Sequence, residues 1–153
     1  MNKFMLEAIN EAKKGVLAGD GGPFGAVIVK NNKIIGKGHN RVILKNDPTA
    51  HAEIEAIRDA SKNINNFKLN GCEIYITAKP CPMCFGAIYW ARLDKVYYGA
   101  DEVDAENIGF SDKEIYDIIQ NKTKPKIEFI QINKKECLEV FRLWSDKKDK
   151  ILY

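Results

Sequence analysis

The sequence has few cysteines and lacks a long apolar run, which argues against a disulfide scaffold and against a membrane span. Its 153 residues include four cysteines and two histidines, and no apolar run approaches the roughly twenty residues of a membrane helix. The first residues carry neither the apolar core nor the cleavage pattern of a secretory signal. We therefore expect no membrane partner and a reducing, cytoplasmic location, where cysteines serve metal binding or catalysis more often than disulfide bonds.

Charge of one sign is also scarce. The 24 basic residues nearly balance the 21 acidic residues, and the net charge of +3 is spread along the chain. Proteins dedicated to duplex nucleic acid or to anionic membranes usually concentrate basic charge on one face. Nucleic acid is therefore not the expected partner.

The chain does contain enough apolar residues, 45%, to fill the core of one domain over residues 1–153. Helical spacing predicts helices at 3–18, from about 47–49 to 60, from 82 to 91, at 112–120 and at 134–147. Alternating and β-branched residues predict strands at 24–29, 33–40, 72–77, 95–99 and 127–132. The expected fold is α/β, a three-layer α/β/α sandwich with a mixed five-stranded sheet. The long connection before the fifth strand lets the last two strands run parallel.

Two cysteines stand three residues apart in the stretch Pro80-Cys81-Pro82-Met83-Cys84. Pro82 fits the first position of a helix capped by Cys81, which places both thiols in the first turn. Free backbone N–H groups and the helix dipole favour thiolates there, and thiolates are good zinc ligands. Taken alone, the stretch also fits a redox pair of the C-x-x-C type or two buried core cysteines.

A second predicted helix start carries His51 and Glu53. Catalytic zinc usually keeps three protein ligands and leaves a fourth position to water. His51, Cys81 and Cys84 supply three ligands, so Glu53 is available beside the metal as a catalytic proton carrier. The sequence therefore predicts one catalytic Zn²⁺ per subunit.

The alternative is a closed, purely structural zinc site with a fourth protein ligand. The remaining histidine and cysteines are His39, Cys72 and Cys137. His39 and Cys72 fall on predicted strands, where such residues are usually packed or hydrogen-bonded, and Cys137 belongs to a distant predicted helix. We therefore expect the fourth position to be open.

Four stretches carry a resemblance to a known family. They are GGPFGAVIV at 21–29, NDPTAHAE at 46–53, PCPMCFGAIYWAR at 80–92 and GFSD at 109–112. The chain resembles the cytidine-deaminase-like superfamily and, within it, the small bacterial guanine deaminases. His-x-Glu followed by Pro-Cys-x-x-Cys is the signature of the zinc nucleobase deaminases. The second stretch and part of the third are shared with tRNA adenosine deaminases and cytosine deaminases, whereas the first and last favour the guanine enzymes.

The resemblance implies a cytidine deaminase-like fold and zinc-dependent hydrolysis of guanine to xanthine and ammonia, with Glu53 passing protons to the ring nitrogen and the departing amine. The residues that it assigns to the purine base are Phe24, Asn40, Ala52, Asp112 and Tyr153. Asp112 would accept hydrogen bonds from the base, Asn40 would donate one, and Phe24 would stack on the ring opposite His51. Each also has a simpler role: Asp112 as a helix-start carboxylate, Asn40 in a turn, Phe24 in the core.

The resemblance also implies a homodimer. In such a dimer the C-terminal segment, here 134–153, covers the active site of its own or of the neighbouring subunit. Tyr153 would then exclude water and hydrogen-bond to the base. The chain departs from the pattern in two places: its tail is slightly longer, and Lys79 stands where relatives commonly have glutamate.

Three other functions stay open at this point. The shared motifs also fit a tRNA adenosine deaminase, although a macromolecular substrate needs a wide active-site entrance with basic residues around it. Guanosine, cytosine or a pterin are alternative small substrates. A non-enzymatic zinc-stabilised module is the third, and it would not need Glu53.

Overall fold

The computed structural model describes residues 1–152, so the prediction for Tyr153 lies outside the described residues. The chain forms two compact units, Met1–Tyr116 and Asp117–Tyr153. That residues 1–153 act as one domain, with 134–153 as a cap, stays a prediction.

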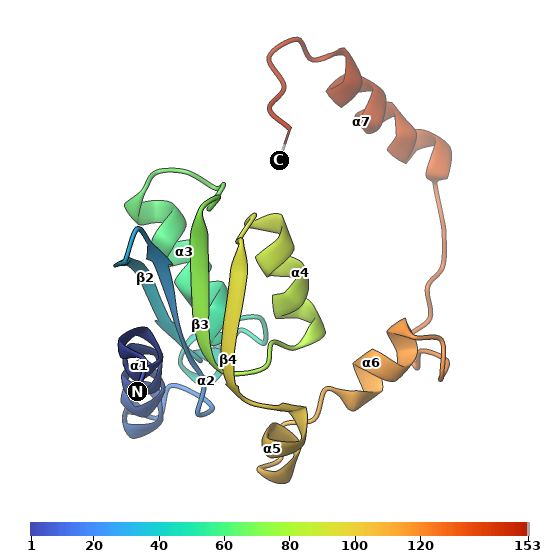
Figure 1. The fold of residues 1–153 in the computed structure, drawn as a ribbon. Coiled ribbons are helices and arrows are strands. Elements are labelled where there is room, and N and C mark those ends of the chain that lie inside the picture. The colour runs from blue at the N-terminus through green and yellow to red at the C-terminus, as the bar shows by residue number, and fades with distance from the viewer. Residues whose placement is uncertain (153) are drawn as a thin grey trace. The chain divides into compact units, whose positions relative to one another are not determined.

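The first unit contains the whole sheet (Figure 1). Its strands are β1 (Gly25–Lys30), β2 (Lys33–His39), β3 (Cys72–Ala78) and β4 (Lys95–Ala100). Its helices are α1 (Lys3–Ala18), α2 (Val42–Lys45), α3 (Ala52–Asn63), α4 (Pro82–Trp90) and α5 (Glu102–Asn107), and α6 (Lys113–Ile119) runs across the boundary between the units. The four strands coincide, within a residue or so at their ends, with the first four predicted strands.

The strand order in the sheet is β2-β1-β3-β4. β1 runs antiparallel to both β2 and β3, whereas β3 and β4 are parallel. A tight turn joins β1 and β2, with positive φ at Asn31 and Asn32. α4 forms the crossover between the two parallel strands, so it begins at the carboxyl end of β3, where ligands of α/β sheets usually bind.

Apolar side chains alternate between the two faces of the sheet. Ile28 and Ile74 belong to a core cluster with the buried residues of α3 and α4. Val27, Val29 and Tyr75 point to the opposite face and pack against α1. The predicted three layers are therefore present, with α3 and α4 as one outer layer and α1 as the other (Figure 1).

Two glycines in β2 let α3 lie directly on the sheet. A Cβ atom on Gly38 would lie 2.5 Å from backbone atoms of Ala52 and Ala56, and one on Gly36 would lie 2.6 Å from atoms of Ala56 and Ala60. A side chain at either position would therefore push the helix outward. Because α3 begins at Ala52, this close packing also fixes the position of the residues at its start.

The prediction of a fifth strand is wrong. Residues 127–132 form no strand, and the sheet has four strands within residues 1–152. An alternating pattern makes a strand only where a neighbour takes up its backbone hydrogen bonds, and the described part of the second unit contains no other strand. Phe129 is accordingly 86% exposed. β4 pairs only with β3 in the described chain, so its outer edge has no strand partner there.

The second unit is built around α7 (Lys134–Asp146), which agrees with the predicted helix at 134–147. Apolar side chains along this helix, including Leu138, Phe141 and Trp144, are exposed. Among residues 1–152, every helix is too short or too polar to cross a lipid bilayer.

Candidate metal centre and active site

Two helix starts meet at one end of the sheet. His51 caps α3, and Cys81 caps α4 with Pro82 at the first helical position. Neither cap residue uses its side chain to hold the helix end, so the imidazole ring and the sulfur are available for another role. Glu53 and Cys84 follow in the first turns of the two helices, where the sequence predicts them.

The three predicted ligand atoms lie together. His51 Nδ1 is 3.6 Å from Cys81 Sγ and 3.6 Å from Cys84 Sγ, and the three atoms all lie within 4.8 Å of one another. A tetrahedral zinc ion with usual bond lengths separates a nitrogen ligand from a sulfur ligand by about 3.6 Å. One imidazole and two thiols at these distances therefore fit zinc.

The two thiols already differ in their affinity for a proton. The hydrogen bond from Cys84 lowers the pKa of the Cys81 thiol to about 4, with a further contribution from His51. The same hydrogen bond, together with burial, raises the pKa of Cys84. The hydrogen bond with Cys81 raises the pKa of His51. Cys81 is therefore ready to bind a cation as a thiolate, whereas Cys84 and a protonated His51 each release a proton when the cation binds.

Glu53 lies next to the ligands without joining them. Its side chain is buried, and burial raises its pKa. Within residues 1–152, no further histidine, cysteine, aspartate or glutamate joins the cluster of three ligand atoms. His39 and Cys72 are buried elsewhere and Cys137 is exposed on α7. The arrangement therefore favours a three-ligand site with a carboxyl group beside it, over a closed site.

A pocket of about 480 Å³ opens onto this centre. Every predicted substrate residue within the described chain lines it: Phe24, Asn40, Ala52 and Asp112, together with His51, Glu53 and Cys81. These residues come from five separate parts of the sequence. The fold therefore brings the predicted site together from the residue before β1, the residue after β2, the two helix starts and the segment before α6.

Asn40 is held in a fixed orientation at the pocket wall. Its Oδ1 accepts a hydrogen bond from the backbone N–H of Val42 at 3.1 Å, and its own backbone N–H donates to the carbonyl of Phe24 at 3.0 Å. Because the oxygen of the side-chain amide is bonded to the backbone, the amide presents its NH₂ group as a donor. This is the polarity that the sequence-based assignment requires.

Asp112 lies directly before α6 and lines the pocket. It is half-buried, and burial raises the pKa of its carboxyl group. A half-buried carboxyl group facing a pocket is suited to accept hydrogen bonds from a ligand. Its position before a helix is equally that of a helix-start carboxylate, so both sequence-based roles agree with its place in the fold.

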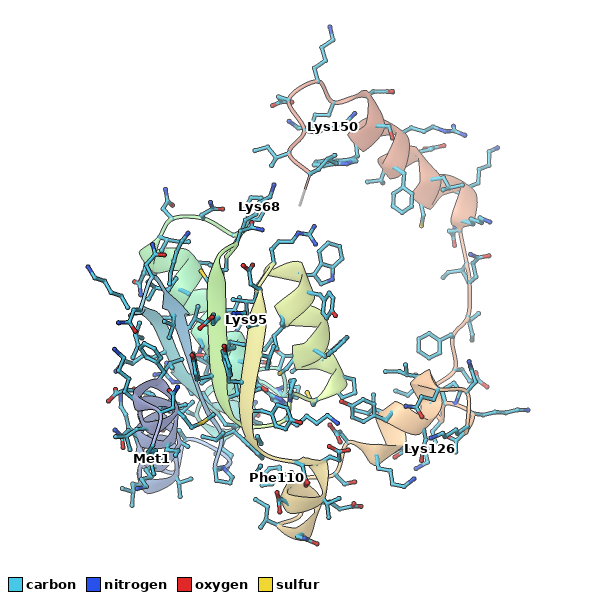
Figure 2. All side chains as sticks on the ribbon, in the orientation of Figure 1. Met1, Lys68, Lys95, Phe110, Lys126 and Lys150 are labelled. Carbon is cyan, nitrogen blue, oxygen red and sulfur yellow. The ribbon has the colours of Figure 1, made fainter. Side chains whose placement is uncertain are left out.

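Several pocket residues were not predicted as functional. Phe110, labelled in Figure 2, meets the ring of Phe24 edge to face, with centroids 4.9 Å apart. The Tyr116 hydroxyl donates to the carbonyl of Pro80 at 3.2 Å, and Lys79 forms a 2.9 Å ion pair with Glu102. Phe110 belongs to the GFSD stretch at 109–112, so the sequence did contain a motif that could have pointed to this residue. Nothing in the sequence pairs Lys79 with Glu102, because α5 was not predicted.

The site and fold together define a class of protein. A His-x-Glu motif and a Pro-Cys-x-x-Cys motif, brought together on two helix starts of an α/β sandwich, are the mark of the zinc-dependent deaminases. The chain belongs to the family of the cytidine and deoxycytidylate deaminase zinc-binding region, whose model matches residues 1–100. The predicted superfamily, the deaminase chemistry and the zinc cofactor are thereby confirmed.

Similarity to individual relatives extends beyond that region. The chain is 46% identical over 151 residues to the guanine deaminase of Bacillus subtilis (strain 168), covering 98% of this chain and 97% of that protein. The crystal structure of a Bacillus subtilis guanine deaminase covers 100% of this chain and 99% of its own, with a TM-score of 0.94 at 46% identity. A tRNA-specific adenosine deaminase of Buchnera aphidicola subsp. Schizaphis graminum is 42% identical over 118 residues, 77% of this chain and 76% of that protein.

Proposed function

We propose that this chain catalyses the hydrolytic deamination of guanine to xanthine and ammonia. The observation that carries the proposal is the polarity of one pocket, in which the NH₂ group of Asn40 and the carboxyl group of Asp112 surround the centre formed by His51 and the two cysteines. The full-length similarity to a guanine deaminase supports it, because the match includes residues beyond 100, where Asp112 lies.

Recognition of guanine needs an acceptor for its N–H groups, a donor for its carbonyl oxygen and a surface for its ring. Asp112 accepts from the N–H groups, and Asn40 donates to the carbonyl oxygen. Phe24 stacks on the ring, supported at its edge by Phe110. Ala52 lines the pocket at the start of α3, where backbone N–H groups lack helical partners.

Zinc held by His51, Cys81 and Cys84 would supply the Lewis acidity that makes water a nucleophile near neutral pH. Glu53 takes the proton that the attacking water loses, when the new bond to the ring carbon forms. It returns that proton to the neighbouring ring nitrogen and then carries the second water proton to the amine, which leaves as ammonia. Its raised pKa suits this work, since the carboxyl group must hold a proton between the two transfers.

A panel assay for ammonia release tests the proposal. The substrates are guanine, guanosine, cytosine, adenine and an adenosine-containing tRNA anticodon stem, each with the zinc-loaded protein. We expect release from guanine far above that from the others. Activity on the tRNA stem without activity on guanine would overturn the proposal in favour of the second candidate, tRNA adenosine deamination, which the 42% identity to the Buchnera enzyme supports.

Replacing Asp112 with asparagine should reduce guanine turnover by about tenfold to a hundredfold, since a charge-assisted hydrogen bond to the base is lost. Zinc content should stay unchanged, because Asp112 is outside the ligand cluster. Asp94→Asn is the matched control, because Asp94 is exposed and outside the pocket lining. Steady-state kinetics with each panel substrate measures the effect. An unchanged specificity profile would leave Asp112 only its helix-start role.

A homodimer with exchanged C-terminal segments is part of the proposed function, and a reducing cytoplasm, which preserves the thiol ligands, is its proposed location. The outer edge of β4 has no strand partner within residues 1–152, and open edges tend to recruit another chain. The alternating apolar segment 127–132 is exposed, as is much of the apolar side of α7. A second copy can use both, since exchange of identical segments is a common route to dimers. Residues 134–153 would then cap the partner's pocket.

Light scattering should therefore give a mass of about twice the 17.3 kDa of one chain. Phe129→Asp should shift the protein toward the monomer, because it places a charge in the segment proposed to pair. Leu17→Asp is the control, since Leu17 is an equally exposed apolar residue on α1. A monomeric wild type, or equal behaviour of the two variants, would contradict the exchange.

A further inference from the structure

His39, at the end of β2, is buried between two carboxyl groups that the proposed chemistry does not use. Its side chain is 1% exposed. Nε2 lies 2.7 Å from Oδ2 of Asp20, and Nδ1 lies 3.2 Å from Oε2 of Glu11. Each ring nitrogen is therefore within hydrogen-bonding distance of one carboxyl oxygen, so the ring joins Glu11 to Asp20. The third charged group facing the ring is Arg41, whose Nε is 3.4 Å from Nε2.

A glycine in α1 leaves room for the His39 ring. A Cβ atom on Gly15 would lie 2.6 Å from Cδ2 of His39, so the helix carries a glycine where the imidazole packs. Glu11, one turn earlier on the same helix, holds Nδ1. The cluster therefore joins α1, the end of β2 and the segment that follows α1. An apolar side chain could fill the same space. It would lack the hydrogen bonds that fix the orientation of α1, the end of β2 and the segment after α1 relative to one another.

Asp20 and His39, which form the 2.7 Å hydrogen bond, are each followed in the sequence by residues of the pocket wall. Asp20 is followed by the Gly21–Phe24 loop, and its carbonyl accepts from the backbone N–H groups of Ile43 and Leu44 at 3.1 and 3.0 Å. His39 is followed by Asn40. A Cβ atom on Gly21 would lie 2.1 Å from Asn40 Oδ1, so the loop and the asparagine are in direct contact.

We infer that His39 is a positioning residue for substrate binding. Clamped by Asp20 and Glu11, it fixes the distance between the Gly21–Phe24 loop and Asn40, the two parts of the wall that carry the stacking ring and the amide donor. It does not line the pocket, and it is separate from the proposed zinc ligands, which lie at the starts of α3 and α4. The inference rests on the proposed function for the identity of the base. That His39 fixes the position of the pocket wall rests only on its contacts with Asp20 and Glu11.

The test compares His39→Gln and Asp20→Asn with the wild type, all zinc-loaded. We expect KM for guanine to rise by about fivefold to twentyfold, as a fraction of a buried charge-assisted bond is lost, with kcat within about twofold because the metal and Glu53 stay in place. Hydrogen exchange should become faster in peptides covering 20–24 and 40–46. Asp20→Asn keeps the shape of the cluster, so it gives the answer if His39→Gln does not fold.

Glu7→Gln is the matched control, because Glu7 also joins α1 to β2, through an exposed 2.7 Å ion pair with Lys37, yet has no link to the wall. It should change neither KM nor exchange. Unchanged KM and exchange in the two test variants would overturn the inference, and so would a loss of zinc with equal falls in kcat and KM. If the wild type is inactive on guanine, the proposed function fails. The hydrogen-exchange data alone then decide whether His39 fixes the position of the pocket wall.

Discussion

Replacing Glu53 with glutamine should leave zinc bound and reduce turnover on guanine by at least a hundredfold, and by up to about ten-thousandfold. The carboxyl group is buried beside the ligand cluster but does not belong to it, so its loss should not release the metal. Glutamine keeps the shape and the hydrogen-bonding capacity of the side chain but cannot accept and return a proton. Because the same group serves two proton transfers, the loss should lie toward the larger value. Metal analysis and steady-state kinetics on one preparation measure both effects.

Glu55→Gln is the matched control for this prediction. Glu55 lies two residues further along α3, is equally buried, and does not line the pocket. Its carboxylate pairs with Lys45 at 2.6 Å and Arg58 at 2.9 Å. The substitution should lower stability by disturbing these pairs while turnover changes only a few-fold. Near-normal turnover of Glu53→Gln, or equal losses in both variants, would contradict the role given to Glu53.

The metal-binding part of the site could be predicted because it depends on short stretches of sequence. A cap residue and the first turn of a helix lie within four residues, so Pro82 and the spacing of Cys81 and Cys84 already fix where the sulfurs point. His51 and Glu53 have the same relation to α3. What the sequence does not contain is the distance between the two helix starts, which the crossover through α4 and the close packing of α3 on the β2 glycines set.

The parts that could not be predicted depend on contacts between distant residues. The alternation at 127–132 predicts a strand, yet a strand exists only with a partner, and a single chain need not supply it. Phe110 acquires its role from Phe24, which lies far away in the sequence, and Lys79 from Glu102. His39 was expected to be a packed or hydrogen-bonded strand residue, and its link to the pocket wall follows only from where Asp20 lies.

Removing zinc should abolish turnover, and restoring it should recover the activity. The stronger prediction concerns pH, because zinc needs both thiolates and a neutral imidazole. With its pKa at about 4, Cys81 is already ionised near neutral pH, whereas the raised pKa of Cys84 keeps that thiol protonated. Zinc binding should therefore release one proton from Cys84, and a second from His51 at pH values below its raised pKa.

Affinity for zinc should accordingly fall as the pH falls, by about tenfold per pH unit for each proton released. The decline should steepen once His51 becomes protonated in the metal-free protein. Competition with a chelator at several pH values gives the affinity, and calorimetry in buffers of different ionisation enthalpy counts the protons. Cys84→Ser should lose zinc and activity at every pH, whereas Cys137→Ser, at an exposed position on α7, should match the wild type. Zinc affinity that is constant between about pH 6 and pH 8 would show that the ligands are already deprotonated in the metal-free protein, and would contradict the proton linkage described for Cys84 and His51.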